Sequence, residues 1–180
     1  RAFTSIIAGY PWFSDWGRDT MIALPGLLLT TGRYGEALSA LQAFAAMLRD
    51  GLVPNCFDDA GGEAQYNTAD ASLWFIHACC EYRRTSGDTR GFAQSLLPAC
   101  LEIVEAYTRG TAYDIKVDPA DGLVACGHDR TQLTWMDAAR DGVIFTPRAG
   151  KPVEINALWH SVLKRLALLV GPAQGHVAAR

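Results

Sequence analysis

The spacing of apolar residues is the feature of this sequence that most constrains its fold. Between residues 34 and 49, apolar side chains recur every three or four positions, as at Leu38, Leu41 and Phe44. This period matches the turn of an α-helix and gathers the apolar residues on one face. Similar patterns elsewhere predict five helices in all, over residues 19–29, 34–49, 67–84, 89–109 and 153–170.

Proline and glycine refine this prediction. Pro25 and Pro98 fall inside two of the helices and predict kinks, because proline lacks an N–H and clashes with the preceding turn. Asp118-Pro-Ala-Asp-Gly122 separates two short apolar stretches and predicts a small β-hairpin. Gly51 is a candidate C-terminal cap for the second helix. Residues 128–151 are expected to be mostly irregular. The pattern predicts an all-α fold of antiparallel helix pairs, which could form a toroid, a solenoid-like arc or an irregular bundle.

Composition and charge exclude several classes of partner. The chain has 180 residues, the size of one domain, and a net charge of −3 from scattered charges. No block of basic residues suggests nucleic acid or an anionic membrane surface. No apolar run reaches the roughly 20 residues of a membrane span. We therefore expect neither nucleic acid nor a membrane as a partner.

The cysteines argue against a metal centre or a redox motif. There are five, an odd number; Cys79 and Cys80 are adjacent, and no C-x-x-C pair occurs. Metal knuckles and dithiol motifs need such pairs. We expect buried free thiols in a reducing compartment and no bound metal.

The segment from Tyr10 to Thr20 concentrates the chemistry of a sugar site. It holds four aromatic residues, two carboxylates and one arginine. Aromatic faces stack on sugar rings, and the adjacent Arg18 and Asp19 can donate to and accept from neighbouring hydroxyls. The alternative is that Trp16 belongs to the core and Arg18 pairs with an acid at a helix start. The density of these residues favours a pocket for a neutral, polar, ring-shaped ligand.

Three further clusters carry similar groups, each with a structural alternative. Asn67 and Asp70 precede Trp74, and simple N-capping would explain both. Asp137 follows Trp135 and Met136, where apolar surroundings would help a carboxylic acid keep its proton; the alternative is an exposed loop aspartate or an N-cap.

The fourth cluster begins the last helix. Glu154 and Asn156 would point from the helix start toward whatever Asp137 faces, although Glu154 could merely complement the helix dipole. Other chemistries find no support: there is no glycine-rich phosphate loop and no G-x-S-x-G elbow, and His77 lies on an apolar helix face as a core histidine. We expect no cofactor.

Taken in order, these motifs resemble those of a known enzyme family. The chain is similar to the glucosidase domain of glycogen-debranching enzymes, the amylo-α-1,6-glucosidases, in their archaeal and bacterial form. The similarity covers about residues 8 to 165. The matching segments are Pro11–Thr20, Thr31–Tyr34, Gly51–Asn55, Tyr66–Trp74, Leu133–Asp137, Thr146–Arg148 and Glu154–Trp159.

The resemblance implies an (α/α)6 toroid that releases glucose from α-1,6 branch stubs of glycogen, limit dextrin or related α-glucan oligosaccharides. It implies inversion by two carboxyl groups, ~6.5–9.5 Å apart in such enzymes. By the same resemblance, Asp137 is the general acid, and the base lies outside this chain, with Glu154 as a fallback. The residues implied in binding the terminal glucose are Trp16, Arg18, Asp19, Asn67, Asp70, Trp135, Glu154 and Asn156.

The resemblance also implies an incomplete domain. Residues 1–180 would form the N-terminal portion of the toroid, roughly its first half, without the N-terminal β domain and C-terminal hairpins of bacterial members. We expect such a chain to need the remainder of its polypeptide and to be inactive alone. The expected compartment is the cytoplasm. The alternatives are a related toroidal glucosidase (glucoamylase-, trehalase- or oligosaccharide-glucosidase-like), a phosphorylase, or a non-catalytic carbohydrate-binding fragment.

Overall fold

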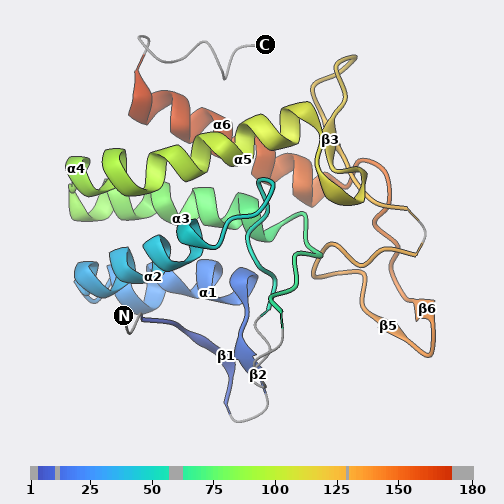
Figure 1. Cartoon of the computed structure of the whole chain (residues 1–180), viewed down its shortest axis with the longest axis horizontal. Helices are drawn as coiled ribbons and strands as arrows, with labels where there is room; N and C mark the ends of the chain where they lie inside the picture. Colours follow the sequence, from blue (N-terminus) through green and yellow to red (C-terminus); the bar gives the residue numbers. More distant parts are fainter. Residues whose placement is uncertain (1–3, 11–12, 57–62, 129, 172–180) are drawn as a thin grey trace.

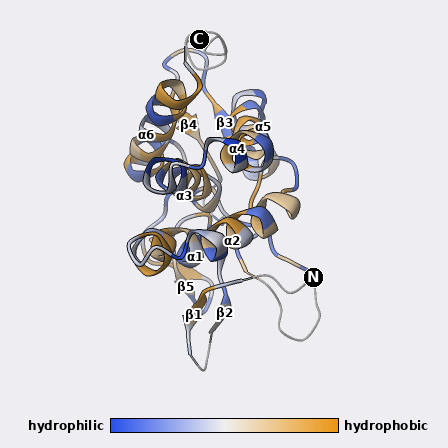
Figure 2. Ribbon diagram, turned by 90° about the vertical axis from the view of Figure 1, so that its left-hand side faces the viewer, coloured by the Kyte–Doolittle hydropathy of each residue, from blue (hydrophilic) through white to orange (hydrophobic). Residues whose placement is uncertain are grey.

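A central helix, α3, organises the packing of the chain. The computed structural model describes residues 4–10, 13–56, 63–128 and 130–171. Within them α3 contacts α1, α2, α5 and α6, and in Figure 2 it lies between the α5–α6 pair above and the α1–α2 pair below. The main helices are α1 (Gly17–Leu24), α2 (Tyr34–Ala46), α3 (Ala71–Ser86), α5 (Leu97–Arg109) and α6 (Val153–Val170).

The fold is mostly helical, as expected, and its apolar helix faces form one continuous core. Fully buried residues such as Leu41, Phe75 and Ile103 come from three different helices and join the same cluster. None of the helices in the described ranges is long and apolar enough to cross a membrane.

The two expected proline kinks take the form of widened turns. A π-helical turn, η1 (Pro25–Leu29), continues α1, and the Thr30 N–H donates to the Pro25 carbonyl at 3.0 Å. A second one, η2 (Phe92–Leu96), follows the short α4 (Thr89–Gly91) and precedes Pro98. The single helix expected over residues 89–109 is therefore interrupted. A wider turn accommodates the proline ring, which would otherwise clash with a carbonyl one turn earlier.

Two helix boundaries differ by three or more residues from the sequence prediction. Helix α2 ends at Ala46, and Gly51 does not cap it but completes a tight turn with Asp50. Helix α3 begins at Ala71 and not at Asn67. Its first N–H, on Ala71, donates to the Thr68 hydroxyl at 3.3 Å. Of the two caps that the sequence suggests, Asn67 and Thr68, it is therefore Thr68 that supplies the acceptor.

Short antiparallel strand pairs lie in the loops. The expected hairpin around Asp118–Gly122 is present as β3 (Lys116–Val117) and β4 (Val124–Ala125), preceded by a 3₁₀ turn, η3 (Ala112–Asp114). Two other pairs were not expected: β1 (Ile7–Gly9) with β2 (Phe13–Asp15), and β5 (Ala139–Arg140) with β6 (Val143–Ile144). In the described part of residues 128–151, no further strand or helix is present besides β5 and β6.

The long loops gather at one end of the helices. Figure 1 shows the first residues of α1, α3 and α6 at the same end as β3, β5 and β6. Hydrogen bonds tie these segments together: the Gly17 N–H donates to the Asn55 carbonyl (2.8 Å), and the Ala69 N–H donates to the Leu133 carbonyl (2.8 Å). Residues more than 60 positions apart therefore share one loop-bearing end.

Candidate functional site

A hollow of about 270 Å³ opens at this loop-bearing end and joins three of the sequence clusters. Its wall residues are Trp16, Arg18, Asn55, Asn67, Gln132, Thr134, Trp135, Asp137 and Ala138. We call it the central pocket. A second hollow of about 270 Å³ lies beside it and is lined by Ala8, Trp16, Arg18 and Asp19. Trp16 and Arg18 form the partition that both hollows share.

Arg18 is held in position by a buried carboxylate. Its Nε donates to Asp70 Oδ2 at 2.8 Å, and the Asp70 side chain is only 1% exposed. The Thr68 hydroxyl donates to the other Asp70 oxygen at 2.6 Å. Because its charge is matched and both oxygens are bonded, Asp70 can stay buried. Asp70 therefore positions Arg18 and does not itself line the central pocket.

Asn55 and Asn67 face each other across the wall of the pocket. Asn55 Nδ2 donates to Asn67 Oδ1 at 3.3 Å. The Asn55 side-chain oxygen is buried and has no hydrogen-bond partner among the described residues. A buried polar oxygen left unpaired is costly, so this wall is suited to a ligand that brings a donor.

Asp137 lines the pocket but is bound to its own loop. The Leu133 N–H donates to Oδ2 at 2.8 Å, and the Thr134 N–H lies 3.1 and 3.2 Å from the two oxygens. The residue is 2% exposed, whereas neighbouring Trp135 is 62% exposed. The carboxyl group is therefore buried, as the apolar neighbours suggested, and backbone amides of its own loop hold it.

Trp135 and Gln132 flank Asp137 on the same loop. The exposed Trp135 indole lies on the rim of the pocket, where it can stack on a bound ring. The Gln132 amide donates to the Asp137 carbonyl at 2.9 Å and closes the loop from the other side. The loop thus presents an aromatic face beside a carboxyl group, the combination expected from the sequence.

Glu154 and Asn156 are engaged away from the pocket wall. Glu154 accepts from Arg148 Nε at 2.8 Å, and Arg148 also donates to the Met136 sulfur at 2.9 Å. Asn156 pairs with the backbone of Val124, accepting from its N–H at 2.7 Å and donating to its carbonyl at 3.1 Å. The structure therefore does not bring these two side chains into the pocket lining with Asp137.

The electrostatic field of several carboxylates nevertheless acts on one buried thiol. Burial, together with the negative charges of Asp137, Glu154 and Asp70, raises the pKa of Cys126 to about 11. These three acids, which come from three different sequence clusters, therefore influence the same side chain. Among the described residues, no group of three or more His, Cys, Asp or Glu side chains is placed to hold a metal ion.

Sequence reasoning missed Asn55, Gln132 and Thr134 as pocket residues. Each lies within or beside a quoted motif: Asn55 ends Gly51–Asn55, and the other two flank Leu133. A single asparagine or glutamine in a loop carries little signal of its own. Only the folding of the Asn55 and Gln132 loops against each other marks them as parts of one wall.

Comparison with known proteins identifies the family. The family model described as amylo-alpha-1,6-glucosidase matches residues 1–175. The chain belongs to this family. It is also similar to a glycogen debranching enzyme of Saccharomyces cerevisiae (strain ATCC 204508 / S288c), with 33% identity over 218 aligned residues. The match covers 89% of this chain and 14% of the yeast protein, so the chain spans about one seventh of that relative's length.

Proposed function

We propose that the central pocket binds the terminal glucose of an α-1,6 branch stub and that the protein hydrolyses its glycosidic bond. The observation that carries this proposal is that one hollow is lined by polar and aromatic side chains together, from Trp16, Arg18, Asn67, Trp135 and Asp137. Such a wall suits an uncharged ring with many hydroxyls. The family membership and the glycogen debranching relative support a glucan as the substrate.

In the proposed mechanism Asp137 is the general acid. It would protonate the glycosidic oxygen as the bond to C1 breaks, while a second carboxylate activates water on the opposite face of the ring. The Leu133 and Thr134 amides, which now hold the Asp137 side chain, would have to release one oxygen for this step. We assign no base within these residues, because the Glu154 carboxylate is already paired with Arg148.

The remaining side chains would bind and orient the sugar. Arg18, fixed by Asp70, would donate to the glucose hydroxyls, and Asp19 would accept from them across the adjoining hollow. These bonds would promote the reaction to the extent that they strengthen as the ring flattens. The arrangement is consistent with residues 1–180 as part of an (α/α)6 toroid whose site lies at the loop-bearing end.

The test is replacement of Asp137 by Asn in the full-length protein. We expect glucose release from limit dextrin to fall by about 10²–10⁴-fold, as for loss of a general acid, with little change in substrate binding. The matched control is Asp141→Asn, because Asp141 is exposed on the neighbouring β5–β6 turn, where its side chain lies 3.7 Å from Arg140. Unchanged turnover in Asp137→Asn would reject this assignment.

One observation favours a second candidate, a non-catalytic carbohydrate-binding module. Both Asp137 oxygens are held by backbone amides, so the carboxyl group can serve the loop's structure alone. Two measurements on the full-length protein separate the candidates: calorimetric titration with maltose oligomers, and glucose release from α-1,6, α-1,4 and α,α-1,1 substrates with and without phosphate. Binding without any glucose release would favour the binding module. Turnover of one linkage would instead identify the type of glucosidase or phosphorylase.

A further inference from the structure

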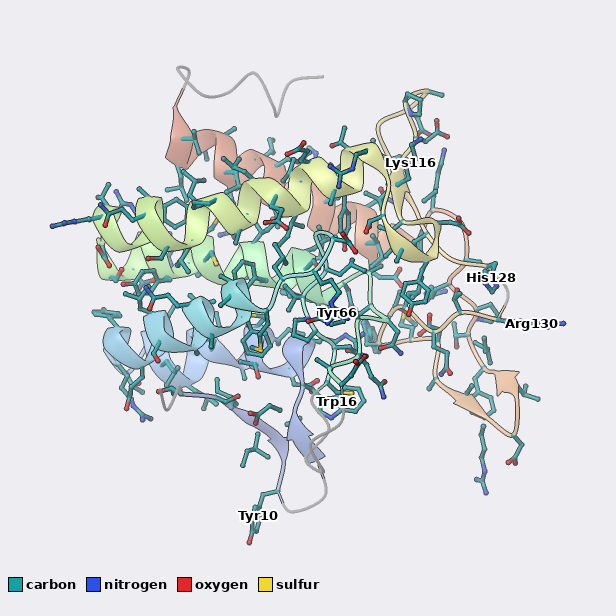
Figure 3. The ribbon with its side chains drawn as sticks, in the orientation of Figure 1. Tyr10, Trp16, Tyr66, Lys116, His128 and Arg130 are labelled. Atoms are coloured by element: carbon teal, nitrogen blue, oxygen red, sulfur yellow. The ribbon has the colours of Figure 1, made fainter. Side chains whose placement is uncertain are left out.

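A third hollow adjoins the central pocket at the loop-bearing end. It encloses about 450 Å³ and is lined by residues that include Arg49, Asp50, Gln65, Tyr66, Asn67 and Tyr113. Its volume falls in the ~300–1,000 Å³ range usual for ligand sites. Asn67 lines both this hollow and the central pocket, so the two meet at one side chain. Figure 3 labels Tyr66, which lines this hollow, and Trp16, which lines the central pocket.

We propose that this hollow, which we call the acceptor hollow, binds the α-1,4-linked glucan chain that carries the α-1,6-linked glucose. The inference rests on the proposed function. A glucose stub is joined to the main chain through a single oxygen and methylene group. When the stub occupies the central pocket, the main chain must therefore lie directly outside it, and the acceptor hollow is a neighbouring space lined for a sugar.

The walls of the acceptor hollow have the chemistry of a glucan site. Tyr113 is 42% exposed, so part of its ring is free to stack on a pyranose. Tyr66 supplies a second ring, with the Arg49 guanidinium 4.6 Å from its centroid. Arg49 and Asp50 carry opposite charges, and no other charged side chain lines the hollow among the residues that the structure describes. This balance favours a neutral polyhydroxyl ligand over a phosphate or a carboxylate.

The two sides of the acceptor hollow are fastened to each other before any ligand binds. Asp50 and Gly51 have φ values of 51° and 74°, which form a tight turn closed by Arg49 and Leu52. The Thr111 hydroxyl donates to the Asp50 carbonyl at 2.7 Å and so links this turn to the segment that bears Tyr113. A site that is already ordered loses less entropy on binding.

The Tyr113 ring is held at the surface by an unusual backbone. Tyr113 and Asp114 both lie in the left-handed region, with φ values of 59° and 56°. This conformation costs energy in a bulky residue. The Gly127 N–H stabilises it by donating to the Tyr113 carbonyl at 2.8 Å. On the other wall, the Tyr66 hydroxyl donates to the Met47 carbonyl at 2.8 Å, which fixes that ring as well.

The experiment compares a substrate that has a main chain with one that has none. In the full-length protein, we expect Tyr113→Ala to raise KM for limit dextrin by about tenfold, the effect of truncating one aromatic contact. Tyr113→Phe keeps the ring and should stay within twofold of wild type. Hydrolysis of α-glucosyl fluoride, which has no glucan chain, should be unchanged in both variants. The matched control is Leu168→Ala, which removes a large apolar side chain, 84% exposed, near the C-terminal end of α6.

Binding of a cyclic α-1,4 glucan gives a readout that does not depend on catalysis. β-Cyclodextrin has no chain end to enter the central pocket, so Tyr113→Ala should weaken its binding, whereas Asp137→Asn should not. Asp50→Asn is a second variant that should also weaken β-cyclodextrin binding. Asparagine tolerates the left-handed backbone at this position, so the turn should be kept. Unchanged KM and unchanged β-cyclodextrin affinity in a folded Tyr113→Ala protein would overturn the inference. If the wild-type protein releases no glucose but Tyr113→Ala still weakens cyclodextrin binding, the proposed function is overturned. The acceptor hollow would then still be a glucan-binding site.

Discussion

At the scale of single residues, Gly17 determines how closely the first motif approaches the loop that carries Asn55. The Gly17 N–H donates to the Asn55 carbonyl at 2.8 Å, and a β-carbon at Gly17 would lie 2.1 Å from the Pro54 carbonyl oxygen. No side chain fits between these backbones. Because Trp16 and Arg18 flank this glycine, the contact also sets where the two pocket residues lie.

Gly17→Ala should therefore destabilise the protein and disturb the central pocket. The added methyl group must push apart two backbone segments, at a cost of about 1–3 kcal/mol in the free energy of unfolding. Urea unfolding measures the loss, and glucose binding should weaken with it. Gly26→Ala is the matched control, because a β-carbon there meets nothing within 4 Å. Equal stability of the two variants would contradict the close contact.

At the scale of elements, the Asn156 side chain joins α6 to the β3–β4 hairpin by bonding to the hairpin backbone as a neighbouring strand would. The Asn156 amide makes two hydrogen bonds with the backbone of buried Val124, and its Nδ2 also donates to the Pro152 carbonyl at 3.0 Å. The stacked rings of Tyr107 and Trp159, 5.9 Å apart, join α5 to α6 nearby. This role for Asn156 is to hold elements together, whereas the family resemblance implied sugar binding.

Asn156→Ala should leave the Val124 N–H and carbonyl without their side-chain partner. The expected loss is about 1–3 kcal/mol in the free energy of unfolding, the cost of unpaired buried polar groups. Amide hydrogen exchange at Val124 should accelerate. Lys164→Ala, at an exposed position of the same helix, should change neither quantity. A variant that keeps full stability and protection but binds glucose poorly would restore the sugar-binding role.

At the scale of the whole molecule, α3 is the helix on which the others pack, and it contains a histidine that resists protonation. Burial lowers the pKa of His77 below its usual value of 6.5, and the positive charge of Arg165 on α6 lowers it further. Glu81 opposes this shift, but Glu81 is paired with both Arg84 and Arg165. The Trp74 ring packs edge-on against His77 at 5.4 Å.

This shift predicts a loss of stability in acid. The unfolded chain takes up a proton on His77 at pH near 6.5, whereas the folded chain does so only at lower pH. Stability should therefore fall as pH decreases from 6.5 toward the lower folded pKa, and then level off with respect to this group. His77→Gln should flatten that part of the profile in denaturant unfolding from pH 7.5 to 5. His160→Gln, on an exposed position of α6, should not.

The apolar period was sufficient to predict the helices, because each needs a buried face at 3.6-residue spacing. The prediction of α6 over residues 153–170 is confirmed to the residue. The end of α2 and the start of α3 differ from the prediction, because the terminal turn of a helix depends on the hydrogen bonds that its backbone makes with other segments. Tight turns such as Asp50–Gly51 form only when the flanking backbones can pair. Likewise, the sequence predicts a proline kink but not the π turn that accommodates it.

Residue types and their local spacing were enough to predict the family, the helical class and most of the polar groups available for a sugar site. Which of those groups meet depends on how distant segments pack. The tertiary structure places Arg18 against Asp70, Asn55 beside Asn67, and Asp137 in the amides of its own loop. These pairings join residues that can be more than 50 positions apart, and the packing of α1 and α3, with the loop around Leu133, brings them together.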